Sequence, residues 1–137
     1  MAEIDTHTQN LAARRPLSPH LLIYRPMLTM TMSIVHRITG VALYAGTLLL
    51  AWYLIALASG RAQFEVASAV FGSVPGLIVL FGFTWALFHH LLGGLRHLIW
   101  DQGYGLDHPG REFLAKATLT GGIALTVLVW LVAFLAG

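Results

Sequence analysis

Three long apolar stretches dominate this 137-residue sequence and limit the folds open to it. They lie at about residues 28–59, 68–100 and 114–136, and about 20 apolar residues suffice for a helix to cross a bilayer. Hydrophobic residues make up 57% of the chain and charged residues only 10%, whereas ordinary soluble proteins carry about 25% charged residues. Lipid leaves no backbone group unpaired, and three short spans cannot close a barrel, so we predict an all-α integral membrane protein.

Lysine and arginine residues are distributed unevenly around these spans. Seven of the eight lie before or in the first third of the first span, or between the end of the second span and the start of the third, counting the ends themselves; only Arg61 lies between the first and the second. The positive-inside rule therefore predicts a cytoplasmic N-terminus and a periplasmic C-terminus. Residues 1–26 form a cytoplasmic segment in this interpretation, and residues 27–137 form a three-helix transmembrane domain.

Polar residues gather at the predicted cytoplasmic end of the spans. His36 and Arg37 enter the first span, and Arg96, His97 and Asp101 leave the second. Charged and polar groups are costly inside a membrane and usually have a function there. We therefore expect the functional site at this end.

One histidine of the second span lies deeper than the others. At 1.5 Å rise per residue, His90 lies about 10 Å further into the membrane than His97. Gly94 follows on the same stripe of the helix, with Gly93 at its margin. A neutral imidazole can ligate a metal, and the glycines leave room for a flat group. This pattern is typical of a b-type haem, with its propionates directed toward the interface.

The same residues also allow plainer interpretations, which the spacing leaves open. Gly93 and Gly94 can serve close helix packing, and Arg37 and Arg96 can extend toward lipid phosphates. His89 is expected to be a packing or hydrogen-bonding histidine. The chain has no cysteine, which excludes covalent c-type haem attachment and iron–sulfur ligation.

The number of ligands points to a partner chain. A low-spin electron-transfer haem needs two axial ligands. His36 and His97 are expected near the interface, at the wrong level to face His90 across a ring. The second ligand is therefore expected from another polypeptide of similar size.

Ser33 and Arg37 form a second candidate site. They lie one helical turn apart on one face of the first span. A hydroxyl and a guanidinium suit the carbonyl oxygens of a quinone. From spacing alone, a serine that bonds to its own helix is the favoured alternative.

Three motifs resemble those of one family. "RPLSPHLLIYRP" (15–26), "SIVHRITG" (33–40) and "HLLGGLRHLIWD" (90–101) occur in order. Together they are similar to the cytochrome b membrane-anchor subunits of succinate dehydrogenase, or complex II, in its alphaproteobacterial and mitochondrial branch. The resemblance covers about residues 15–137.

The resemblance implies a role for each matching residue. His90 takes the position of the axial haem ligand, and Ser33 and Arg37 take those of the quinone site. Asp101 stands where the family has an acid near the quinone. The predicted haem contacts, from the motifs and from the helical stripe together, are His36, Arg37, Gly93, Gly94 and His97.

The resemblance also implies cofactors, partners and a location. One haem b is shared with a second three-helix anchor, so the chain forms half of a heterodimeric helix bundle, and ubiquinone is the substrate. An iron–sulfur subunit and a flavoprotein subunit are the soluble partners; membrane lipid surrounds the anchor, and no nucleic acid is expected. The chain itself does not oxidise succinate. The bacterial inner membrane is favoured over the mitochondrial one.

Three alternative functions remain open. They are a fumarate reductase anchor, a structural anchor without haem, and a haem-free transporter or channel subunit with a histidine proton relay.

Overall fold

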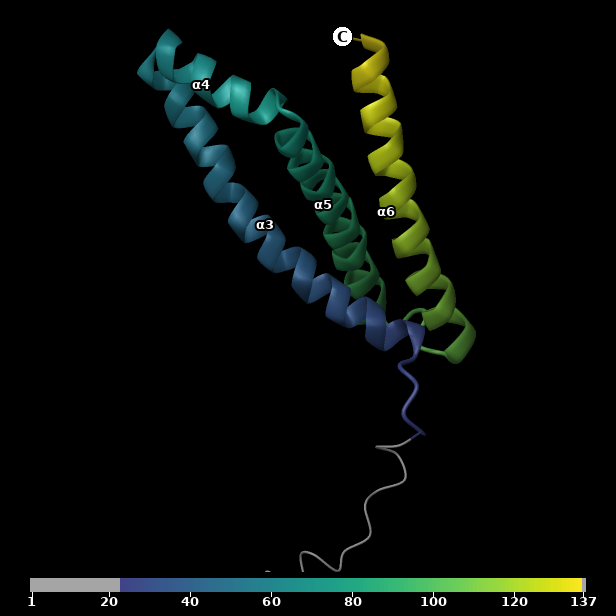
Figure 1. Cartoon of the computed structure of the whole chain (residues 1–137). Helices are drawn as coiled ribbons and strands as arrows, with labels where there is room; N and C mark the ends of the chain where they lie inside the picture. The colour runs from purple at the N-terminus through teal and green to yellow at the C-terminus, as the bar shows by residue number, and fades with distance from the viewer. Residues whose placement is uncertain (1–22, 137) are drawn as a thin grey trace, which may run out of the picture.

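The computed structural model describes residues 23–136, in which four long or medium helices follow one another (Figure 1). They are α3 (Leu28–Ser59), α4 (Arg61–Gly72), α5 (Val74–Asp101) and α6 (His108–Ala136). Helices α3, α5 and α6 are each long and apolar enough to cross a membrane. The prediction of an all-α membrane protein with three spanning helices is thereby confirmed. Most of the predicted segment 1–26 lies outside the described residues.

Helix α5 is the centre of the arrangement. It contacts α3, α4 and α6, and α3 also contacts α6. The start of α3, the end of α5 and the start of α6 lie at one end of the molecule, whereas α4 lies at the other end (Figure 1). The polar residues near the start of α3 and the end of α5 therefore share one end of the bundle.

The stretch predicted as the second span, 68–100, is divided at Ser73. Residues 68–72 belong to α4, and α5 begins at Val74. The Ser73 hydroxyl accepts a hydrogen bond from the Gly76 backbone N–H at 3.2 Å, and Pro75 in the first turn has no N–H to satisfy. Helix α4 is thus a separate element, and its Phe71 packs edge-on against Tyr53 of α3.

The helices approach one another at small residues. A Cβ at Gly46 of α3 would collide with the Phe83 ring of α5, and one at Gly122 of α6 would lie 3.2 Å from Cα of His89. The apolar side chains buried within the described residues are mostly alanines, whereas the leucines, valines and isoleucines largely face outward. An apolar outer surface of this kind is expected for a chain that is surrounded by lipid or by partner helices.

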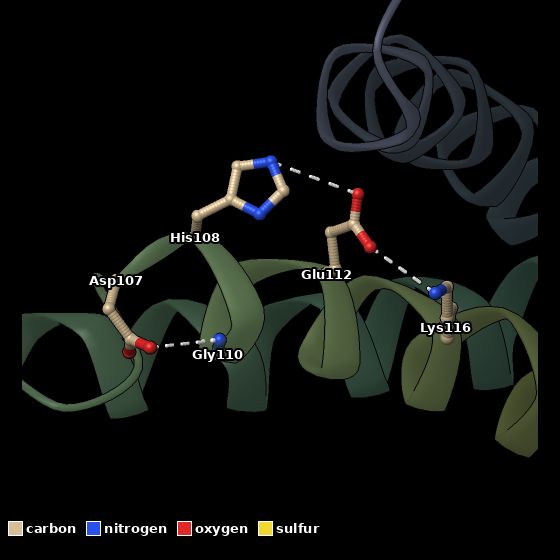
Figure 2. A network of polar contacts seen from close by, with 5 residues as sticks. All are labelled: Asp107, His108, Gly110, Glu112 and Lys116. Carbon is tan, nitrogen blue, oxygen red and sulfur yellow. Dashed lines mark hydrogen bonds and ion pairs between the residues drawn. The ribbon is translucent and has the colours of Figure 1, made fainter.

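The start of α6 is fixed by a network of surface contacts (Figure 2). Asp107 accepts a hydrogen bond from the Gly110 backbone N–H at 3.3 Å, as a helix N-cap does. Glu112 pairs with Lys116 at 3.3 Å and with His108 at 4.0 Å. Because these groups are largely exposed, the ion pairs add little stability. Helix α6 thus begins at His108, before the start of the predicted third span at residue 114.

Candidate functional site

Two histidines meet where α3 crosses α5. The rings of His36 and His90 are stacked, with their centroids 3.9 Å apart and an interplanar angle of 7°. The ring of His97 lies 5.6 Å from that of His36, at a tilt. Two helices thus bring three imidazoles together at the polar end of the bundle.

The stacked pair corrects one expectation. We expected His36 near the interface, at a different level from His90, and this is wrong. Helix α3 begins at Leu28, so His36 lies about 12 Å along the helix from its start at 1.5 Å per residue. That distance carries His36 to the depth of His90.

The orientation of His90 is set by the backbone of α3. Its Nδ1 lies 3.1 Å from the carbonyl oxygen of His36 and 3.4 Å from Oγ1 of Thr39. A carbonyl oxygen can only accept, so Nδ1 is the donor, and in the neutral ring Nε2 then keeps its lone pair. The Thr39 hydroxyl donates to the same carbonyl at 2.9 Å. For a neutral His90 ring, the α3 backbone therefore selects the tautomer that can ligate a metal through Nε2.

The two adjacent glycines of α5 have different surroundings. A Cβ at Gly93 would collide with Nδ1 of His36, whereas one at Gly94 would meet no atom of the chain within 4 Å. Gly93 therefore serves the close approach of α3 and α5, which is the alternative that the sequence left open. Gly94 leaves open space beside His90. A Cβ at Gly40 of α3 would lie 3.1 Å from Cε1 of His90, so this glycine also makes room for the ring.

The other predicted site residues lie on the surface. Ser33, Arg37, His97 and Asp101 are all exposed. Within residues 23–136, none of them forms a hydrogen bond or an ion pair with another side chain. Their groups are free to meet a molecule from outside the chain, and the fold brings Ser33 and Arg37 to the same end as the stacked histidines.

A second face of α5 carries two buried polar groups, and of these we did not foresee the burial of Arg96. His89 is fully buried and Arg96 is 3% exposed. The two ring nitrogens of His89, and Nε and Nη1 of Arg96, have no hydrogen-bond partner among the described residues. The His89 ring instead packs 5.2 Å from that of Trp85, so His89 is a packing histidine. The spacing of seven residues, which puts His89 and Arg96 on one helix face, was the available signal.

Known proteins resemble this chain over most of its length. The family model for the succinate dehydrogenase/fumarate reductase transmembrane subunit matches residues 12–134. The succinate dehydrogenase cytochrome b556 subunit of Paracoccus denitrificans is 46% identical over 120 residues, which cover 88% of this chain and 92% of that protein. The corresponding subunit of Rickettsia prowazekii is 37% identical over 122 residues, covering 89% and 95%. The mitochondrial cytochrome b560 subunit of Sus scrofa is 44% identical over 123 residues, covering 88% of this chain and 69% of that protein.

Proposed function

Because the chain belongs to the succinate dehydrogenase/fumarate reductase transmembrane subunit family, we propose that His90 is one of two axial ligands of a haem b held between this chain and a second anchor subunit. The chain is a membrane-anchoring cytochrome b subunit of a succinate dehydrogenase, as its motifs predicted, and it works in association with the other subunits of that complex. It is a multi-pass protein of a bacterial inner membrane. Haem b is its cofactor.

One observation carries the assignment of the ligand. The Nδ1 of His90 donates to the His36 carbonyl at 3.1 Å, so Nε2 of the neutral ring is the nitrogen available to iron, and Gly94, one turn later on the same helix face, leaves open space. Haem ligands are commonly oriented by such a bond at the other ring nitrogen, and it also raises the basicity of the ligating nitrogen. The residues present thus fit a haem ligated from one side by this chain. Bound haem b supplies an iron centre that accepts and releases one electron.

The surrounding residues have supporting roles in this proposal. Arg37 and His97, at the polar end of the bundle, would contact the haem propionates, whereas His36 lies at the depth of His90 and would support the ring of the ligand. Gly94 would leave room for the haem, whereas Gly93 acts only through the packing of His36. A second ligand would come from the partner anchor, because the ring of His36 is stacked directly on that of His90 and leaves no room for a haem between them.

Ser33 and Arg37 form this chain's part of a ubiquinone site. Both are exposed on α3 one turn apart, so a hydroxyl and a guanidinium can donate to a quinone carbonyl oxygen. Arg37 stabilises the negative charge that develops on that oxygen during reduction. Asp101, at the end of α5, is the proposed acid of the same site and would deliver protons to the quinone. The iron–sulfur subunit covers this end, and the flavoprotein beyond it oxidises succinate.

The rival functions are less well supported. Relatives named as succinate dehydrogenase subunits favour succinate oxidation over a fumarate reductase anchor. A haem-free transporter or channel with a histidine relay, and an anchor without haem, both conflict with relatives named as cytochromes b.

Arg37→Leu is expected to impair ubiquinone reduction at least about tenfold, because a charge-assisted hydrogen bond to the developing oxyanion is lost. Succinate-dependent reduction of an artificial acceptor at the soluble subunits should stay near the wild-type rate. Arg61→Leu is the matched control, since Arg61 lies at the other end of the bundle in an exposed ion pair with Glu65. An equal loss in both assays for Arg37→Leu would contradict a role in the quinone site.

Thr39→Val is expected to leave the haem bound but to shift its midpoint potential to more negative values. Without the competing hydroxyl donor, the His36 carbonyl accepts a stronger bond from Nδ1 of His90, which makes the imidazole a better donor to oxidised iron. Redox titration of the haem absorbance in the purified complex measures the effect. An unchanged potential would show that Thr39 does not act on the ligand.

A further inference from the structure

The cavity between α5 and α6 contains a buried guanidinium without an acceptor. Arg96 is 3% exposed, and its Nε and Nη1 have no hydrogen-bond partner among the described residues. Its Cζ lies 5.0 Å from the centroid of the Trp100 ring. A ring face attracts the charge but does not satisfy N–H groups that lie in the guanidinium plane. The Arg96 group therefore has unused hydrogen-bonding capacity.

No acid of the described chain neutralises Arg96. Within residues 23–136, the ion pairs join Glu65 to Arg61 and Glu112 to His108 and Lys116. An arginine side chain stays protonated in proteins, and an unpaired charge is costly in a low-dielectric environment. A negatively charged group from outside this part of the chain is therefore needed beside Arg96.

The shape and lining of the cavity indicate the class of that group. Its volume is about 210 Å³, and apart from Arg96 and Thr118 its lining is aliphatic, including Leu92, Leu95 and Leu114. One guanidinium among aliphatic walls suits a molecule that has an anionic head and a hydrocarbon tail. A free anion in water gains nothing from leucine walls.

The position of the cavity separates it from the haem site. Successive residues of a helix point about 100° apart, so Arg96 faces α6, whereas His97 lies on the stripe of His90. Arg96 also lies five residues before the end of α5 at Asp101, about 7.5 Å from it. This depth is within reach of the lipid headgroups at that end of the bundle.

We propose that Arg96 binds the phosphate group of a membrane phospholipid, with one acyl chain of that lipid in the cavity between α5 and α6. The lipid phosphate supplies the acceptor that Nε, Nη1 and the cavity lack. The proposal requires only that the chain lie in a membrane, and it is independent of the haem ligand and the quinone site.

The test measures tightly bound phospholipid in the assembled complex, purified in mild detergent, by phosphorus analysis and native mass spectrometry. Arg96→Gln should lose a phospholipid that wild type and Arg96→Lys retain. Arg111→Gln, which removes an exposed arginine at the start of α6, is the matched control and should retain it. The haem spectrum should be unchanged in all four complexes, which separates this result from any failure of the haem assignment.

A second arm covers the case in which Arg96→Gln does not assemble. Ala117→Leu keeps Arg96 but fills the cavity, which Ala117 lines, and it should also lose the lipid. For delipidated wild type, dioleoylphosphatidylglycerol in detergent should raise the Tm, whereas inorganic phosphate should not. Equal lipid content in wild type and the cavity variants would overturn the proposal. Equal stabilisation by inorganic phosphate would assign Arg96 to a free anion and would also overturn the proposal. So would an Arg96→Gln complex that keeps its lipid but loses a subunit, because Arg96 would then pair with a carboxylate of a partner.

Discussion

His90→Ala is expected to reduce the haem content of the purified complex to less than about a tenth of the wild-type level, because an axial ligand with a preset tautomer is lost. His89→Ala, at the adjacent position, is expected to leave the haem in place. The reduced-minus-oxidised absorbance spectrum, with haem content normalised to protein, measures both effects. The two variants differ by one position in the chain, so they distinguish a ligand from a merely nearby imidazole.

The His89 variant also has its own expected defect. His89 is fully buried against α6, where a Cβ at Gly122 would nearly touch its backbone. Removing the ring leaves a cavity, which costs about 2–5 kcal/mol for a large buried side chain. His89→Ala should therefore lower the Tm of the complex while the spectrum stays intact. If instead His89→Ala lost the haem and His90→Ala kept it, the assignment of the ligand would be wrong.

Sequence reasoning succeeded where the bilayer imposes the pattern. In lipid, the three apolar runs can pair all their backbone groups only as spanning helices. The architecture therefore followed from the length and composition of these runs. The break before α5 was harder to place. An apolar run continues through Ser73, and only the serine cap with Pro75 behind it marks the start of a new helix.

The site was predicted less completely because it depends on how two helices are aligned. The stripe of His90, Gly94 and His97 follows from the period of one helix. The level of His36 relative to that stripe depends on where α3 begins and how far it slides along α5, which no single-helix pattern contains. The same alignment places the His36 carbonyl and Thr39 beside His90.

The buried face of α5 was missed for a related reason. Arg96 and His97 are adjacent and polar, and both were expected at the interface. The packing of α6 covers one and not the other, so Arg96 is buried and His97 is exposed. Which of the two adjacent residues becomes buried depends on the position of a third helix, α6, and this position cannot be read from the pattern of α5.

Gly93→Ala is expected to destabilise the complex and lower its haem retention, whereas Gly94→Ala should assemble normally. A methyl at Gly93 would collide with the His36 ring, which is stacked on His90. Overpacking of this kind costs about 1–3 kcal/mol, more than the gain of about 1 kcal/mol from replacing glycine by alanine in a helix. Thermal unfolding of the complex and its haem-to-protein ratio measure the result.

Gly94→Ala has the opposite signature because no atom of the described chain lies within 4 Å of the added methyl. The Tm of the Gly94→Ala complex should not fall. A change in its haem absorbance or electron paramagnetic resonance spectrum would therefore show that the added methyl contacts a group from outside the chain. Gly46→Ala provides the third arm, since it collides with Phe83 away from the histidines. It should lower the Tm without altering the haem spectrum. An equal fall in Tm for the Gly93 and Gly94 variants would mean that contact with the His36 ring is not the reason for the glycine at position 93, because only a Cβ at Gly93 meets that ring.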